Sequence, residues 1–165
     1  KGTIAGQKIA FVGDGNNMAN SLIPGALIAG AQIALACPSG YLPNAQLISK
    51  YSNHADFMLT DDPFQAVEDA DVVITDVWSS MGNEDEAMQR QKVFADGKYQ
   101  LNDRLMAHAK ADAIVLHCLP AHREEEITDK VFEAHSASIF REANNRLHAQ
   151  KAVLVHLLGA EGYDA

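Results

Sequence analysis

The 165-residue sequence is short of the features that mark secreted and membrane proteins. It has two cysteines, Cys37 and Cys118, which lie far apart and form no Cys-x-x-Cys pair. So few thiols argue against a disulfide scaffold and indicate a reducing, cytoplasmic location. No apolar run approaches the roughly 20 residues that span a bilayer, and no signal-like segment precedes the first expected strand. The chain opens on Lys1-Gly2-Thr3, as an excised domain does.

Basic residues are also in the minority, since 13 Lys and Arg face 22 Asp and Glu and give a net charge of −9. An acidic surface repels phosphodiester backbones, which argues against nucleic acid as a partner. Internal repeats, low-complexity segments and internal linkers are missing as well. A chain of this length can bury one core without a disulfide or a structural metal, so we predict a single domain over residues 1–165.

Short apolar runs alternate with helical patterns along the whole chain, which is typical of a parallel sheet covered on both faces. The pattern predicts strands over residues 9–12, 32–36, 56–59, 72–75 and 113–116. It predicts helices over residues 16–29, 45–51, 63–69, 84–94, 103–110, 128–134 and 142–158. In the last helix, Leu147, Leu154 and Leu158 are spaced for burial on one face. The predicted fold is a doubly wound, Rossmann-like α/β domain with a mainly parallel sheet of about five strands and helices on both faces.

Three unusual segments each follow a predicted strand, so they are expected at the same edge of the sheet, where ligands bind in such folds. They are residues 13–17, 76–82 and 117–123. The convergence of all three on one edge is stronger support for a ligand site than any single motif.

The first segment, Gly13-Asp14-Gly15, invites a dinucleotide-binding interpretation, but two features oppose it. Met18 stands where the fingerprint needs a third glycine, and Cys37 follows the second strand where it needs an acidic residue. The alternative is a tight turn in which Asn16 or Asn17 caps the next helix. A helix N-terminus favours anions, so Asn17 also offers its amide to a carboxylate.

The second segment places Asp76 at the end of a buried strand, followed by Ser80, Met81 and Gly82 in a turn. A carboxylate at this edge can accept hydrogen bonds from a ligand ammonium group. The alternative is an aspartate that only caps a loop. Trp78 and Met81 are compatible either with the core or with a lid over a ligand.

The third segment, His117-Cys118-Leu119-Pro120, sets a thiol directly after a buried strand. Two histidines and an arginine nearby are candidates for lowering the pKa of Cys118, although an isolated cysteine is more often inert packing. Pro120 favours an extended conformation at Leu119, which aims backbone carbonyls at a ligand. The following run of residues 124–126, all glutamate, is most simply interpreted as solvated.

Arg146 lies early in the last predicted helix. It is either an ordinary surface arginine or a guanidinium that reaches a phosphate or carbonyl oxygen. The residue types alone leave both interpretations open.

Four motifs occur in the order and approximate spacing of one enzyme family: VGDGNN (12–17), DVWSSMG (76–82), HCLPAHR (117–123) and NRLHAQK (145–151). The chain resembles, over essentially its whole length, the second, ornithine-binding domain of the ornithine carbamoyltransferases. The Ser-Met-Gly loop separates these enzymes from aspartate carbamoyltransferases, and the His-Cys-Leu-Pro segment is highly specific. Two departures, Glu124 for a frequent glycine and Asn144 for a frequent glutamate, touch no expected ligand contact.

The resemblance implies a role for each matching residue. Asn17 and the backbone at Met81 would bind the ornithine carboxylate, while Asp76 and Ser80 would hold its α-amino group. Cys118 would lie beside the reacting amine, and Asp76 and Cys118 are the expected catalytic residues.

The resemblance implies further that the carbonyls of Cys118 and Leu119 bind the carbamoyl nitrogen, and that Arg146 reaches the carbonyl oxygen of carbamoyl phosphate. The implied reaction transfers the carbamoyl group to the δ-amine of L-ornithine and gives L-citrulline and phosphate, a step of arginine metabolism. No metal and no organic cofactor is implied.

The family's Ser-x-Arg-Thr and His-Pro-x-Gln segments, which belong to its first domain and include the grip on the donor phosphate, do not occur in this sequence. We therefore expect the carbamoyl phosphate-binding domain to be absent from this chain and the chain alone to be inactive. For the full-length protein the resemblance implies a homotrimer or a multiple of it. The alternatives are a carbamoyltransferase for putrescine or an N-acylated ornithine, against which Asp76 and Ser80 weigh, and a nucleotide-binding Rossmann-like module.

Overall fold

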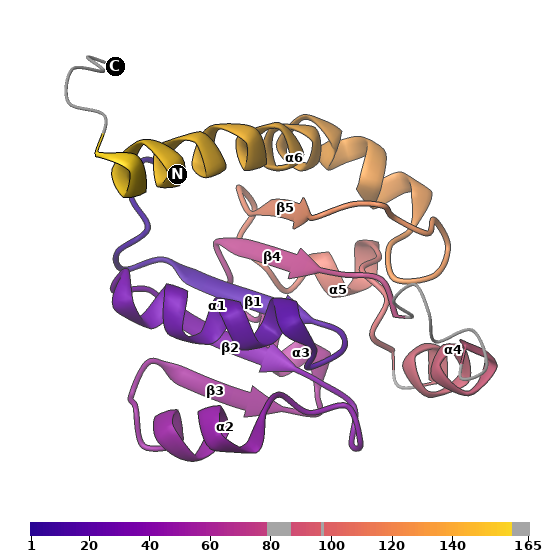
Figure 1. Ribbon diagram of the computed structural model, residues 1–165. Helices are drawn as coiled ribbons and strands as arrows, with labels where there is room; N and C mark the ends of the chain where they lie inside the picture. The colour runs from indigo at the N-terminus through magenta and orange to yellow at the C-terminus, as the bar shows by residue number, and fades with distance from the viewer. Residues whose placement is uncertain (79–86, 97, 160–165) are drawn as a thin grey trace.

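Five strands and six helices alternate along the computed structural model, which describes residues 1–78, 87–96 and 98–159. The strands are β1 (Lys8–Val12), β2 (Gln32–Ala36), β3 (Phe57–Thr60), β4 (Val72–Thr75) and β5 (Ile114–His117). The helices are α1 (Asn17–Ile28), α2 (Ala45–Tyr51), α3 (Pro63–Val67), α4 (Ala87–Asp96), α5 (Asp103–Met106) and α6 (Asp129–Leu158). All strand pairs are parallel, in the order β3-β2-β1-β4-β5, and the arrowheads in Figure 1 point the same way. The predicted α/β fold with a five-stranded parallel sheet is confirmed.

Two apolar clusters lie on opposite faces of this sheet. Ala10 and Val12 of β1 belong to one cluster and Phe11 to the other, because successive side chains of a strand point to opposite faces. The Phe11 side is covered by α1, whereas α3, α5 and the first half of α6 cover the other side. Burial on both faces explains why the strands are apolar throughout instead of alternating with polar residues.

The C-terminal helix differs from the prediction in two ways. It is one helix of 30 residues where the pattern predicts two, and its buried side chains all lie before residue 140. Leu147, Leu154 and Leu158 are 52%, 56% and 78% exposed, so their predicted burial is wrong for this chain. The described residues leave the second half of α6 uncovered. Neither α6 nor another helix in the described part of the chain combines the length and the hydropathy that a membrane span requires.

The strand register brings distant segments together at the carboxyl edge of the sheet. Thr75, the last residue of β4, pairs with Val12 of β1 on one side and with His117 of β5 on the other. The residues that follow these three strands therefore emerge side by side, at the edge to which the arrowheads in Figure 1 point.

Candidate functional site

A cavity of about 530 Å³ opens at this carboxyl edge, between the ends of β1, β4 and β5 and the middle of α6. It brings together five of the residues that the sequence singles out: Asn17, Asp76, Cys118, Leu119 and Arg146. Helix α6 adds Glu142 and Asn145 to the wall. The two remaining predicted site residues, Ser80 and Met81, lie outside the described residues.

The turn after β1 holds Asn17 at the start of α1. Asn16 is the N-cap, and its side chain accepts a hydrogen bond of 3.0 Å from the backbone N–H two residues on. A Cβ at Gly15 would lie 2.2 Å from the backbone nitrogen of Pro43, so glycine is required by packing there. Cys37, at the position of the expected ribose-binding acid, is fully buried. These observations favour the capped turn over a dinucleotide site, and they leave the exposed Asn17 facing the cavity.

Asp76 and Cys118 form the hydrogen-bonded centre of the cavity. Asp76 is buried, and its Oδ1 accepts hydrogen bonds from the backbone N–H of Val77 at 2.8 Å and from Cys118 Sγ at 3.2 Å. Burial raises the pKa of the Cys118 thiol to about 12, and the hydrogen bond and negative charge of Asp76 add to the rise, as does the charge of Glu142. The thiol is therefore neutral at physiological pH, and the nearby histidines and arginine, which were candidates for lowering its pKa, do not lower it.

Arg123 and His117, two of these candidates, are engaged elsewhere. Arg123 forms ion pairs with Asp129 and, at 2.7 Å, with Glu133. His117 is fully buried, with its Nε2 2.9 Å from Oε1 of Glu126. Proximity in the sequence placed these groups beside Cys118, but the turn after β5 directs them away from it.

His117 and Glu126 form a buried pair that the sequence did not reveal. His117 Nδ1 accepts a hydrogen bond from the backbone N–H of Leu119 at 3.0 Å, so its Nε2 carries the proton and donates to Glu126. Glu126 Oε1 also accepts from the backbone N–H of His122 at 2.6 Å. The interpretation of residues 124–126 as a solvated run is therefore wrong at Glu126, which is fully buried. A run of three glutamates carries no signal that would single out its last member.

The backbone after Cys118 also departs from the prediction. Leu119 has φ of +57° and precedes a cis peptide bond to Pro120, so the extended conformation expected at Leu119 is wrong. The residue nevertheless lies in the cavity wall, where the prediction placed it.

Trp78 belongs to the core. It is 3% exposed and stacks on Phe94 of α4 with ring centroids 5.7 Å apart, which decides against a role as a lid. Met81, the other residue considered for a lid, lies outside the described residues.

Glu142 is a cavity residue that the sequence analysis missed. It lies four residues before Arg146, hence on the same face of α6, and helical spacing could have identified it. Burial raises the pKa of the Glu142 carboxyl, and the negative charge of Asp76 adds to the rise, while a backbone hydrogen bond from His117 opposes it. The cavity thus presents the Asp76 carboxylate and the neutral Cys118 thiol at the strand ends, and the Glu142 carboxyl and the exposed Arg146 guanidinium on α6.

Alkaline pH is expected to destabilise the fold. Burial raises the pKa values of Cys37, Cys118 and Tyr99 to about 12, from ordinary values of 9 for the thiols and 10 for the phenol. Above those ordinary values the unfolded chain loses protons that the folded chain keeps, so stability present below pH 9 is lost progressively as the pH rises towards 12. Melting temperatures measured from pH 7 to 11 test this, and a Cys37→Ala variant should show a shallower decline. A melting temperature that stays constant up to pH 11 would contradict the assignment.

One group of potential metal ligands occurs among the described residues, formed by His122, Glu125 and Glu126, whose ligand atoms lie within 4.8 Å of one another. Glu126 is fully buried and already binds His117 and the backbone of His122 through Oε1. The group therefore has a structural explanation that needs no ion, and it lies outside the wall of the main cavity.

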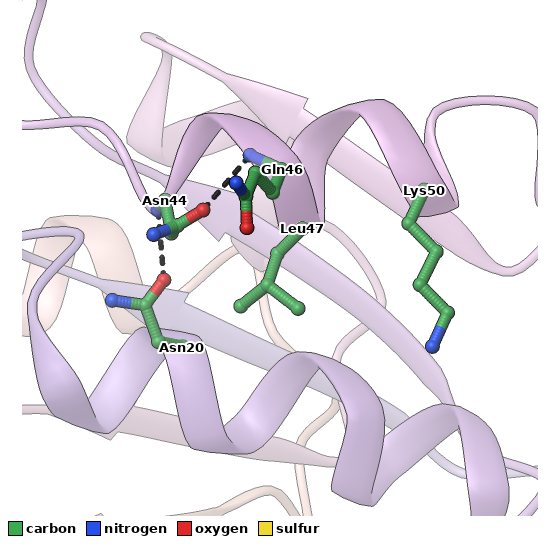
Figure 2. A pocket seen from close by; sticks show the side chains of 5 residues that line it. All are labelled: Asn20, Asn44, Gln46, Leu47 and Lys50. Carbon is green, nitrogen blue, oxygen red and sulfur yellow. Dashed lines mark hydrogen bonds between the residues drawn. The ribbon is translucent and has the colours of Figure 1, made fainter.

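A second hollow, of about 390 Å³, lies between α1 and α2 and is lined by Asn20, Asn44, Gln46, Leu47 and Lys50 (Figure 2). Its amides serve the fold. Asn20 Oδ1 accepts from the backbone N–H of Asn44, and Asn44 Oδ1 accepts from the backbone N–H of Gln46 at the start of α2, both at 2.8 Å. This hollow contains none of the predicted site residues.

The sequence matches a family model described as the Asp/Orn-binding domain of aspartate/ornithine carbamoyltransferase over residues 5–157. Similar curated proteins include the ornithine carbamoyltransferases of Pyrococcus abyssi and Carboxydothermus hydrogenoformans, which are 49% and 51% identical to 96% of this chain. The chain covers 51% and 52% of those two proteins, so it spans about half the length of the curated relatives it matches.

Solved structures give the same result. Ornithine carbamoyltransferase from Pyrococcus furiosus superposes with a TM-score of 0.87 at 47% identity, over 98% of this chain and 52% of its own. The anabolic ornithine carbamoyltransferase from Campylobacter jejuni also has a TM-score of 0.87, at 40% identity, over 93% of this chain and 52% of its own.

Proposed function

Because the chain belongs to the aspartate/ornithine carbamoyltransferase family, in which it matches the Asp/Orn-binding domain, we propose that it is the ornithine-binding half of an ornithine carbamoyltransferase. The main support is the single cavity that collects Asn17, Asp76, Cys118, Leu119 and Arg146 from four motifs far apart in the sequence.

The acceptor amino acid is held by its two charged ends. Asn17, at the N-terminus of α1, binds the carboxylate together with the backbone at Met81, because the exposed N–H groups of a helix start favour anions. Asp76 binds the α-ammonium together with Ser80. An N-acylated ornithine has no free α-amino group and leaves the buried carboxylate of Asp76 without its partner, whereas putrescine has no carboxylate for Asn17 to bind.

The reaction joins the neutral δ-nitrogen of ornithine to the carbonyl carbon of carbamoyl phosphate. The bond from that carbon to the phosphate oxygen breaks, phosphate leaves with the electron pair, and the nitrogen gives up a proton. The carbonyls of Cys118 and Leu119 accept hydrogen bonds from the carbamoyl NH₂ group, and Arg146 donates to the carbonyl oxygen. Catalysis on this scheme comes from alignment and charge stabilisation.

Cys118 acts in this scheme as a hydrogen-bond donor and not as a nucleophile. A thiol with a pKa of about 12 is protonated at neutral pH, and its S–H is directed to Asp76 Oδ1. The thiol therefore orients the carboxylate that binds the α-ammonium, while the adjacent backbone carbonyl serves the donor.

The exposed apolar surface of the chain is consistent with a second half of the protein, which would also bind the carbamoyl donor. The exposed Leu147, Leu154 and Leu158 of α6 are apolar surface without cover from the described residues. A further hollow of about 410 Å³ over β4 and β5 is lined largely by apolar side chains, among them Ile74 and Leu116. Apolar surface of this kind marks an interaction site, and we expect the carbamoyl phosphate-binding half to cover it. As the family resemblance implies, we propose that the full-length protein is a cytoplasmic homotrimer or a multiple of it.

The proposal predicts that the chain alone produces no citrulline. The purified chain, given saturating L-ornithine and carbamoyl phosphate, is expected to show no turnover, because it lacks the groups that bind the donor phosphate. The protein that also carries the upstream half is expected to form citrulline from ornithine and no carbamoylated product from putrescine or N-acetylornithine. Citrulline formation by the chain alone would refute the division of the site. A thermal shift of the chain with NAD, and none with norvaline, would favour the nucleotide-binding alternative instead.

A further inference from the structure

Arg90 of α4 connects two segments of the candidate site without lining the cavity. Its Nη1 lies 2.5 Å from Oδ2 of Asp14 and 3.2 Å from the carbonyl oxygen of Trp78. Its guanidinium carbon lies 4.8 Å from the centre of the Tyr41 ring. Both members of the ion pair are largely shielded, with side chains 13% exposed, so solvent screens their attraction little.

Arg90 binds the Asp14 carboxylate and the Trp78 carbonyl. These two groups belong to the two segments that carry the proposed ligands of the acceptor amino acid, the β1–α1 turn and the segment after β4. Asp14 lies in the turn between β1 and α1, three residues before Asn17. Trp78 lies two residues after Asp76, in the segment that follows β4. One guanidinium nitrogen therefore links the turn that carries Asn17, the proposed carboxylate ligand, to the segment that carries Asp76, the proposed ammonium ligand.

The turn around Asp14 has a second attachment next to the same guanidinium. Gly15 donates its backbone N–H to the carbonyl of Tyr41 at 2.8 Å, and its Cα packs directly against Pro43. Since Arg90 stacks over the Tyr41 ring, it contacts both the turn and the segment on which the turn rests. Displacing this side chain would loosen the turn at two points.

We infer that Arg90 is a positioning residue for the acceptor amino acid: by binding Asp14 and the Trp78 carbonyl together, it sets the separation of Asn17 and Asp76. The inference rests on the proposed function, because it assumes that these two residues bind one amino acid by its carboxylate and its ammonium. Removal of the guanidinium leaves the largely buried carboxylate of Asp14 without this partner, and burial already raises the pKa of that carboxyl. Asp14 then takes up a proton or turns towards water, and in either case the β1–α1 turn shifts.

The test compares Arg90→Met, Arg90→Lys and Asp14→Asn in the full-length protein. We expect Arg90→Met to raise the KM for ornithine about 10- to 100-fold, because a binding site that is no longer preorganised binds its ligand more weakly. The KM for carbamoyl phosphate and kcat should change much less. Arg90→Lys should recover part of the loss, since it keeps the charge but not the planar fork. Asp14→Asn combined with Arg90→Met should be little worse than Arg90→Met alone, because both changes break one interaction.

Arg104→Met is the matched control. Arg104 also stacks on an aromatic ring, that of Phe64 at 5.2 Å, but it is exposed and outside the cavity wall, so ornithine KM should stay unchanged. A lower melting temperature with an unchanged ornithine KM in the Arg90 variants would overturn the inference and leave a purely structural role. If Arg90→Met does not fold, an unchanged ornithine KM in Asp14→Asn, which removes the charge that Arg90 binds, has the same meaning. If the wild-type protein forms no citrulline, the proposed function fails and the inference with it, whereas an active wild type with unaffected variants refutes the inference alone.

Discussion

Replacement of Asp76 by asparagine is expected to lower kcat/KM for ornithine by between about 30-fold and several thousand-fold. This range corresponds to the roughly 2–5 kcal/mol lost when one member of a buried charge pair is neutralised. Asparagine has nearly the same shape and keeps an oxygen that can accept from the Val77 N–H and the Cys118 S–H. The variant therefore removes the charge that binds the α-ammonium while retaining the local hydrogen bonds. Steady-state kinetics of the full-length protein measure the effect.

Two further measurements separate the charge of Asp76 from its structural role. Asp103→Asn is the matched control, because Asp103 is exposed and pairs with Lys130 away from the cavity, and its kinetics should match the wild type. The hydrogen bond and charge of Asp76 contribute to the raised pKa of Cys118, so Asp76→Asn should also lower that pKa from about 12. Burial, the largest cause, should still hold it above the ordinary value. A kcat/KM for ornithine within threefold of the wild type would exclude Asp76 as the ammonium ligand.

Replacement of Glu126 by alanine is expected to destabilise the domain by about 3–5 kcal/mol in total, because two buried N–H donors lose their acceptor and each such loss costs roughly 1–3 kcal/mol. The change leaves the His117 Nε2–H and the His122 backbone N–H without their acceptor. For a domain of this size the expected fall in melting temperature is roughly 6–20 °C. Denaturant unfolding of the chain followed by circular dichroism measures the change in the free energy of unfolding.

Glu126→Gln and Glu125→Ala complete this experiment. Glutamine keeps an oxygen acceptor and loses only the charge assistance, so we expect a smaller loss of about 1–2 kcal/mol. Glu125 is a partly exposed neighbour 3.8 Å from His122, and its replacement by alanine should cost no more than about 0.5 kcal/mol. Equal losses for Glu126→Ala and Glu125→Ala would show that the buried pair adds no stability.

The predicted site residues that line the cavity all stand next to a strand end or on a helix that follows one. Asn17, Asp76 and Cys118 could be placed at one edge because parallel strands bring their carboxyl ends to the same side of a sheet. Arg146 and Glu142 follow from helical spacing once α6 is placed beside that edge. Arg90 could not be found in this way, because its partner Asp14 lies 76 residues away and no local pattern connects them.

The apolar stripe on α6 shows a different limit. Leu147, Leu154 and Leu158 have the spacing of a buried face, yet all three are exposed in this chain. Periodicity indicates that a face is suited to burial, but it does not say which part of a protein provides the cover. Here the described residues do not supply it, in agreement with a chain that spans about half the length of its relatives.

The sequence by itself determined the parallel α/β architecture, because apolar period and strand–helix alternation are local properties of the chain. It also determined which segments meet at the carboxyl edge, since parallel topology leaves them no other place. Only the tertiary structure decided that the Cys118 thiol is neutral and that Glu126 is buried beside His117. It also decided that Arg90 contacts both Asp14 and the Trp78 carbonyl. These depend on desolvation and on partners distant in sequence, and both quantities exist only after the chain has folded.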